Sequence, residues 1–231
     1  MASPIVIIHG WTYTIEPWKQ TVELLRAQGF EVIQLKVPGL TAPSDEIWTI
    51  DNYVTWLESQ LLTIKHPIVI GHSNGGRIAL HYLLSHRGAF EKLILINSAG
   101  VETAANPLSI KRQVLRVASK VLAPLKYIPG VKKIVYRVLG SDYGRAPKNM
   151  QTTLQHMLES DRDFSPRDIE TPTIILWGED DATTPLAMGQ KIASEMPRAR
   201  IFTFPDWKHA PYITHPSELA EAIVDAIGVV L

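Results

Sequence analysis

The stretch Gly71-His72-Ser73-Asn74-Gly75 comes directly after a short apolar run, Pro67-Ile68-Val69-Ile70. A serine with a glycine two positions away on each side, between a strand and a helix, is the sequence form of a nucleophile elbow. Any side chain at the glycine positions would collide with the backbone of so tight a turn. Residues 76–84 place apolar side chains at helical spacing and so supply the helix. A Gly- and Ser-rich turn without chemistry is the competing interpretation.

Short apolar runs alternate with helical patterns along the rest of the chain. Strands are expected at 5–9, 31–36, 68–72, 92–97, 173–177 and 199–204, and helices at 16–28, 50–62, 76–84, 186–195 and 217–227. Strands that are apolar on both faces and alternate with helices are typical of a parallel sheet covered on both sides. The sequence therefore predicts an α/β fold, with residues 1–231 forming one domain.

Residues 102–166 interrupt this alternation. The segment contains helical patterns punctuated by proline and glycine, and no convincing strand. We expect a helical lid inserted over the carboxyl end of the sheet, which is where open α/β sheets place ligands. Between Thr103 and Met150, ten Lys and Arg side chains stand against one acid, Asp142. The predicted lid is therefore strongly basic.

The overall composition narrows the functional class. The chain has 231 residues, enough for one domain with a large core, and its formal net charge is zero, so no global field favours nucleic acid or a membrane surface. It has no cysteine, which excludes disulfides, thiol catalysis and thiolate metal sites. No apolar run approaches the ~20 residues of a membrane span. The first residues lack the features of a signal peptide, so we expect a cytoplasmic protein.

A serine hydroxyl is a poor nucleophile at neutral pH. It needs a general base within hydrogen-bond reach and an acid that orients this base. In the predicted architecture these partners belong on loops after later strands, in the chain order serine, acid, histidine. The loop after the fifth strand contains three acids at 179–181, and the loop after the sixth contains His209. Both expected loops thus have the required residue types.

At these positions the chain resembles the α/β-hydrolase superfamily, over nearly its full length. The family's first loop is matched by His9-Gly10-Trp11, and its elbow by Gly71 to Gly75. The acid loop, G-x-x-D-x-x-x-P, is matched by Gly178, Asp181 and Pro185, and the histidine segment by His209 followed by Pro216 and Glu218. The family usually opens with two further strands. The resemblance therefore implies an α/β-hydrolase fold whose mostly parallel sheet of about six strands is shortened at one edge.

The resemblance also implies roles for individual residues. Ser73 would be the nucleophile, His209 the base and Asp181 the orienting acid. The backbone amides of Trp11 and Asn74 would form the oxyanion hole. These five residues are the predicted catalytic site.

Neighbouring residues compete for these roles. Glu179 and Asp180 directly precede the predicted acid, but the motif spacing favours the third acid of the run. His215 precedes a proline and is expected to introduce the last helix. His72 is expected to be a packed elbow residue, and His9 to shape the first loop. No pair of histidines stands at ligand spacing with a carboxylate, so we expect no metal.

The implied activity is hydrolysis of carboxylic esters with small to medium acyl chains, through an acyl-enzyme and without a cofactor. Because the base must be neutral, activity should fall as the pH drops through roughly 6 to 7. Family members that remove a methyl ester from a carrier-linked acyl chain dock the acidic carrier protein on basic lid residues, so such a carrier is a second expected partner. Solvated helix faces are the other interpretation of those charges. Carbon–carbon bond hydrolysis and a purely binding role are the further alternatives.

Overall fold

The computed structural model describes residues 3–103 and 146–231. Within them, six parallel strands form one sheet in the order β2-β1-β3-β4-β5-β6. The strands are β1 (Ile5–Ile8), β2 (Val32–Gln34), β3 (Ile68–His72), β4 (Lys92–Ile96), β5 (Thr173–Gly178) and β6 (Ala199–Phe204). The α-helices are α1 (Lys19–Ala27), α2 (Ile50–Leu61), α3 (Asn74–Ser85), α6 (Lys148–Ser160), α7 (Leu186–Glu195), α8 (Pro211–Thr214) and α9 (Pro216–Gly228). The predicted fold class and number of strands are confirmed.

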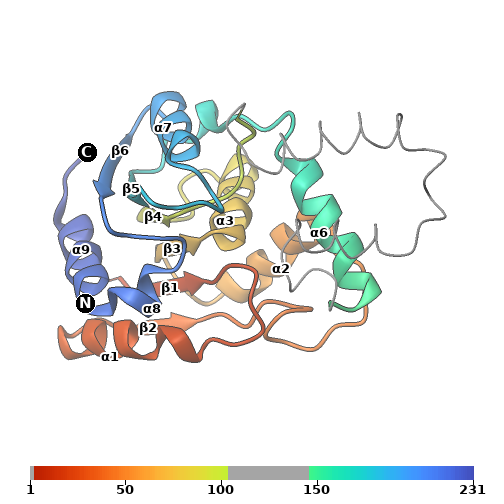
Figure 1. The fold of residues 1–231 in the computed structure, drawn as a ribbon, viewed down its shortest axis with the longest axis horizontal. Coiled ribbons are helices and arrows are strands. Elements are labelled where there is room, and N and C mark those ends of the chain that lie inside the picture. The colour runs from red at the N-terminus through yellow and green to blue at the C-terminus, as the bar shows by residue number, and fades with distance from the viewer. Residues whose placement is uncertain (1–2, 104–145) are drawn as a thin grey trace.

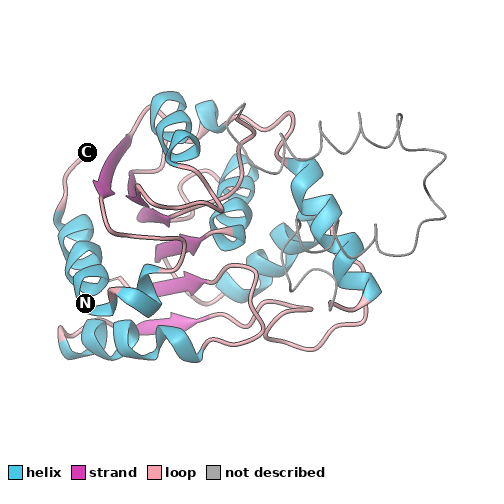
Figure 2. Ribbon diagram, viewed as in Figure 1, coloured by secondary structure: helices cyan, strands magenta, loops and turns pink. Residues whose placement is uncertain are grey.

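Helices cover both faces of the sheet (Figure 1, Figure 2). Ile5 and Ile7 of β1 belong to the apolar cluster under α1 and α9, whereas Val6 and Ile8 belong to the cluster under α2, α3 and α7. All four side chains are buried. Because successive side chains of a strand point to opposite faces, one continuous apolar run supplies both cores.

The largest differences from the expected bounds are in the first helix and in β2. The helix expected at 16–28 begins as a 3-10 turn, η1 (Glu16–Trp18), with Pro17 in its first turn, and α1 follows from Lys19. Proline has no N–H to donate, so it suits the start of a helix, where that group would be unpaired. β2 is shorter than expected, and no other described strand pairs with its outer side. There Arg26 Nη2 donates to the carbonyl of Val32 at 2.8 Å.

Of the predicted lid at 102–166, residues 104–145 lie outside the described part of the chain. The described remainder contains α6 and ends at Pro166, the first residue of a 3-10 turn, η3 (Pro166–Asp168). α6 packs near α2 and is fastened there by a hydrogen bond from the Trp48 amide to Thr153 Oγ1, at 2.9 Å. Both chain termini lie on the opposite side of the molecule from α6 (Figure 1).

Candidate active site

The turn between β3 and α3 holds Ser73 in a strained backbone conformation, with φ 51° and ψ −119°. A Cβ added to Gly75 would lie 2.0 Å from the carbonyl oxygen of Ile8, and one added to Gly71 would lie 2.6 Å from the Cα of Gly76. Both contacts are with backbone, which cannot move aside. Non-glycine residues adopt such a φ only where the surroundings enforce it. The close packing of α3 on β1 is that constraint here.

Three side chains from the ends of β3, β5 and β6 form a hydrogen-bonded chain. His209 Nε2 lies 3.0 Å from Ser73 Oγ, and His209 Nδ1 lies 2.7 Å from Asp181 Oδ2. Because the Asp181 carboxylate only accepts, Nδ1–H is the donor and Nε2 is left to accept from the serine hydroxyl. The ends of parallel strands meet at one edge of the sheet, so loops distant in sequence bring these groups together.

The Asp181 carboxylate is buried and fully hydrogen-bonded. Its Oδ1 accepts from the amides of Thr183 and Thr184, at 2.7 and 3.0 Å, and its Oδ2 accepts from the Thr184 hydroxyl at 2.7 Å. Burial by itself raises the pKa of this carboxyl, but the hydrogen bonds from His209 and Thr184 outweigh that effect and lower the pKa below its ordinary value. Asp181 is therefore an ionised partner for the imidazole.

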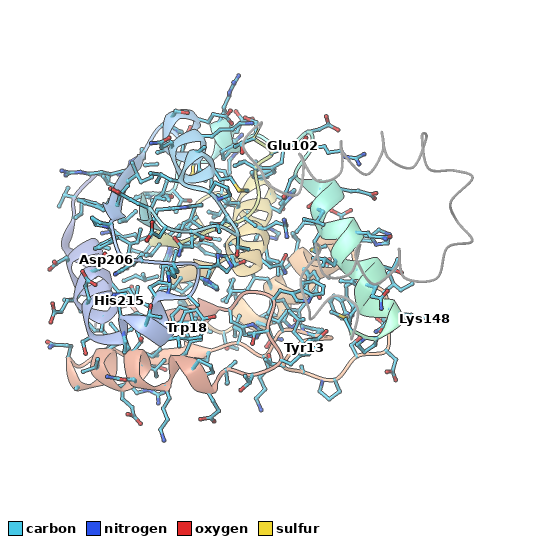
Figure 3. All side chains as sticks on the ribbon, in the orientation of Figure 1. Tyr13, Trp18, Glu102, Lys148, Asp206 and His215 are labelled. Atoms are coloured by element: carbon cyan, nitrogen blue, oxygen red, sulfur yellow. The ribbon has the colours of Figure 1, made fainter. Side chains whose placement is uncertain are left out.

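The competing acids and the competing histidine lie elsewhere. Glu179 and Asp180 are exposed to solvent, and Glu179 accepts a hydrogen bond from Thr203 Oγ1 at 2.8 Å. His215 is the N-cap residue of α9 (labelled in Figure 3), and its Nδ1 lies 2.8 Å from the hydroxyl of Thr214. Of these acids and histidines, only Asp181 and His209 belong to the hydrogen-bonded chain that ends at Ser73.

Asn97, directly after β4, connects the acid loop with the histidine loop. Its Nδ2 donates to the carbonyl of Lys208 at 2.8 Å, and its Oδ1 accepts from the amide of Gly178 at 2.8 Å. The residue is completely buried and has φ 44°, a conformation that asparagine tolerates better than most residues. Asn97 was not among the residues predicted from the sequence. The available signal was a lone polar residue at the end of an apolar strand.

Two further histidines buttress the site without touching the serine hydroxyl. His72 Nε2 donates to the backbone carbonyl of His209 at 2.7 Å, and the His72 ring packs edge-on against Tyr212. His9 donates from Nδ1 to the Gly10 carbonyl at 2.7 Å, and its Nε2 accepts from the Thr41 hydroxyl at 2.6 Å. Burial lowers the pKa of both rings, so each is neutral at pH 7. They order the loops around the site.

The first loop lies against the elbow. A Cβ added to Gly10 would lie 2.8 Å from both the Cβ of Ser73 and Nδ1 of His72. In the described part of the chain, no backbone carbonyl accepts from the amide of Trp11 or of Asn74. Asn74 is the first residue of α3, whose N-terminus has a positive partial charge. Among residues 3–103 and 146–231, neither amide is therefore taken up by a backbone carbonyl.

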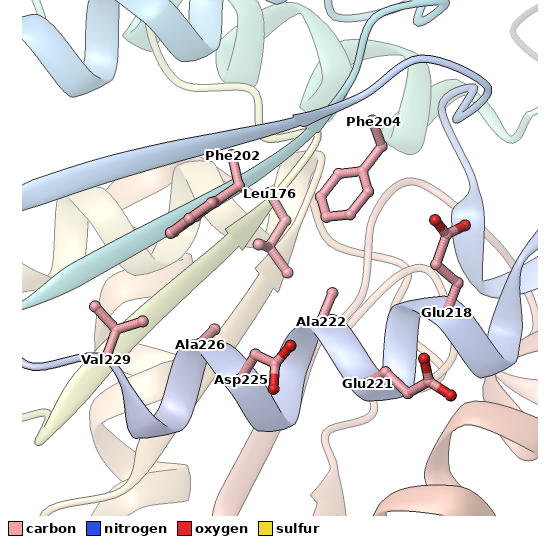
Figure 4. Close-up of a pocket in the computed structure, with 9 residues that line it drawn as sticks. All are labelled: Leu176, Phe202, Phe204, Glu218, Glu221, Ala222, Asp225, Ala226 and Val229. Carbon is pink, nitrogen blue, oxygen red and sulfur yellow. The ribbon is translucent and has the colours of Figure 1, made fainter.

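A groove of about 350 Å³ lies between β6 and α9, on the face of the sheet that α1 and α9 cover (Figure 4). Phe202 and Phe204 form part of its wall, and Glu218, Glu221 and Asp225 line its rim. None of the residues that line it belongs to the hydrogen-bonded chain around Ser73. The groove is therefore separate from the candidate active site.

The sequence matches the alpha/beta hydrolase family over residues 5–222. The chain belongs to this family. This alpha/beta hydrolase is 26% identical over 251 residues to the pimeloyl-[acyl-carrier protein] methyl ester esterase of Vibrio vulnificus (strain YJ016), covering 97% of this chain and 94% of that protein. It is 24% identical over 246 residues to the uncharacterized hydrolase YugF of Bacillus subtilis (strain 168), covering 96% and 89%.

Solved structures agree with this membership. A probable hydrolytic enzyme from Pseudomonas aeruginosa PAO1 superimposes on this alpha/beta hydrolase with a TM-score of 0.72 at 20% identity, covering 98% of this chain and 85% of the other. At that identity the likeness concerns the fold. Within residues 3–103 and 146–231, no helix combines the length and apolar character needed to cross a membrane.

Proposed function

We propose that this alpha/beta hydrolase cleaves carboxylic esters of small to medium acyl chains, with Ser73 as nucleophile, His209 as general base and Asp181 as the orienting acid. The observation that supports this proposal is the unbroken hydrogen-bonded chain from carboxylate to imidazole to hydroxyl, with distances of 2.7 and 3.0 Å. That order of groups is what acyl transfer by a serine requires.

The reaction proceeds in two steps. Ser73 Oγ attacks the ester carbonyl while its proton passes to His209 Nε2, and the Asp181 carboxylate stabilises the resulting imidazolium. The Trp11 and Asn74 amides bind the oxyanion, and each such donor commonly lowers a barrier by about 3 kcal/mol. His209 returns the proton to the leaving alcohol, then activates the water that hydrolyses the acyl-enzyme.

A series of p-nitrophenyl esters from acetate to decanoate tests this proposal. We expect turnover that is highest for the short and medium chains and is abolished in Ser73→Ala. Because Ser73 is nearly buried and its hydroxyl makes one side-chain contact, the variant should keep the fold, which circular dichroism checks. Folded wild-type protein that leaves every ester intact would contradict the proposal. Activity on dienoic ketoacids alone would then indicate carbon–carbon bond hydrolysis.

Two separate observations support a more specific substrate, a methyl ester on a carrier-linked acyl chain. The Vibrio vulnificus relative is named for removing a methyl ester from a carrier-linked acyl chain. In this chain, ten basic side chains against one acid between Thr103 and Met150 would attract an acidic carrier. In this version, residues 102–166 form the lid and the docking surface, and the protein works in the cytoplasm, where such a carrier would be found.

Salt dependence separates this narrower version from the general esterase. The same methyl ester is supplied either on an acidic acyl carrier protein or on free phosphopantetheine. Raising the ionic strength from about 0.05 to about 0.5 M shortens the Debye length about threefold, so kcat/KM for the carrier-linked ester should fall. The free ester should be unaffected. Equal salt dependence of the two substrates would exclude docking by the basic segment.

A further inference from the structure

A buried ion pair links the end of α6 with the start of α3. Arg77 Nε donates to Asp161 Oδ1 and Arg77 Nη2 donates to Asp161 Oδ2, both at 2.7 Å. Arg77 is 3% exposed and Asp161 is 4% exposed. The two residues are 84 positions apart in sequence, because Arg77 lies in α3, before β4, and Asp161 lies between β4 and β5. The pair is bidentate, the geometry that fixes both partners most firmly.

Neither charge stabilises its own helix. Arg77 lies in the first turn of α3, where the helix dipole disfavours a positive charge. Asp161 is the C-cap residue of α6, where the dipole disfavours a negative charge. Burial adds a desolvation cost for both groups. Both charges are buried at helix ends that disfavour them. Their interaction with each other and with a third group explains why they are there.

That third group is Asn74, the residue after Ser73. Arg77 Nη1 donates to Asn74 Oδ1 at 2.5 Å, while the other two guanidinium nitrogens hold Asp161. The Asn74 side chain is 3% exposed, and its Nδ2 has no hydrogen-bond partner among the described residues. Among the described residues, the Arg77 guanidinium is therefore the only hydrogen-bond partner of the Asn74 side chain. The backbone amide of the same residue is one of the two proposed oxyanion donors.

We propose that the Arg77–Asp161 pair is a positioning device that fixes Asn74, and with it the oxyanion side of the elbow, from the end of α6. This inference rests on the proposed function of Ser73 as a nucleophile. Asp161 holds the guanidinium plane, the guanidinium holds the Asn74 side chain, and the Asn74 backbone amide keeps its direction relative to Ser73. The C-terminal end of α6 is thus connected to the elbow through the hydrogen bonds of the Arg77 guanidinium.

The decisive variant is Arg77→Met/Asp161→Leu, which replaces the whole pair by apolar side chains. Such replacement commonly preserves or raises stability, whereas removal of one partner leaves a charge buried. We expect the double variant to fold and to melt several degrees below the wild type, because Asn74 Oδ1 loses its partner. Its kcat for a p-nitrophenyl ester should fall about 10- to 100-fold, with KM changed far less. The rate of Ser73 phosphonylation by a fluorophosphonate should fall by a similar factor.

The matched control is Arg162→Met/Asp163→Leu, the same changes at the next two residues, which are exposed. It should keep the wild-type kcat. Asn74→Ala is a second test that leaves the ion pair and the backbone amide in place, and it should lose a similar factor in kcat. Wild-type kcat in a folded double variant, or in Asn74→Ala, would overturn the inference. A wild-type protein that neither hydrolyses esters nor reacts at Ser73 would instead contradict the proposed function.

Discussion

The backbone carbonyl of His209 accepts a hydrogen bond from Nε2 of His72, the residue before Ser73, at 2.7 Å. This hydrogen bond joins the elbow to the histidine loop without involving the side chains of Ser73, Asp181 or His209. His72 is buried, and its ring packs edge-on against the stacked rings of Trp18 and Tyr212. The bond therefore ties the backbone of residue 209 to the last residue of β3.

The burial of His72 predicts a pH dependence of stability. Burial, aided by the nearby His209, lowers the pKa of His72 from 6.5 to about 3. Between those values the unfolded chain binds a proton that the folded protein does not, so stability falls as the pH drops through this window. The slope is about 1.4 kcal/mol per pH unit for one such group.

Urea unfolding of the wild type and His72→Gln near pH 7, 6 and 5 measures this slope. We expect the free energy of unfolding to fall less steeply with acid in the variant, by up to about 1.4 kcal/mol per pH unit below pH 6 and by about half of that between pH 7 and 6. His66→Gln, at an exposed histidine, should keep the wild-type slope. Parallel curves for all three proteins would show that His72 titrates normally in the folded state.

Asp181→Asn should remove the acid but keep the shape of the loop. An amide in this position can donate to Nδ1, which favours the wrong imidazole tautomer, and kcat should fall by roughly 10⁴-fold. Asp180→Asn makes the same chemical change one residue earlier, at an exposed side chain, and should leave kcat unchanged. Steady-state kinetics of both variants decide which carboxylate is the acid. A larger loss in Asp180→Asn would reassign it.

Asn97→Ala should reduce both activity and stability. It leaves the Gly178 amide and the Lys208 carbonyl without their partner, and unpaired buried groups cost about 1–3 kcal/mol each. Loosened loops should lower kcat by about 10-fold or more. Asn52→Ala, which removes a capping side chain of α2, should cost about 1 kcal/mol of stability and nothing in kcat. Unchanged kcat in folded Asn97→Ala would show that the loops hold without this bridge.

Gly75→Ala should destabilise the fold severely. Its Cβ would come within 2.0 Å of the Ile8 carbonyl, and both β1 and α3 are anchored in the core. We expect a loss of about 3 kcal/mol or more, visible as a lower melting temperature or insoluble protein. Gly228→Ala, where an added Cβ would meet no atom within 4 Å, should be neutral or slightly stabilising. Equal stability of the two variants would contradict the tight elbow.

The fold was predictable because its signals are local. Continuous apolar runs such as Ile5–Ile8 identify buried parallel strands, and helical spacing identifies the layers around them. The first and last residues of the helices and strands were less predictable. α3 begins at Asn74 rather than at the expected residue 76. The glycines there weaken helix propensity, but Gly75 is required by the close approach to Ile8 of β1 and Gly76 by the close approach to Ser98.

The polar links around the site were not predictable from local signals. The Asn97 bridge spans 111 residues to Lys208, and the Arg77–Asp161 pair spans 84. Nothing in the sequence near either residue reveals its partner, since the contacts depend on how loops pass one another above the sheet. His72 was expected to be a packed elbow residue. Its hydrogen bond to the His209 carbonyl was not predicted, because it too joins residues that are distant in sequence.

We propose that His209 activates Ser73. Reaction with a fluorophosphonate, followed by mass mapping of the modified peptide, tests this most directly. We expect one adduct, on Ser73, which forms rapidly in the wild type and at a rate lower by several orders of magnitude in His209→Ala. An adduct on another residue, or equal labelling rates in the two folded proteins, would contradict it.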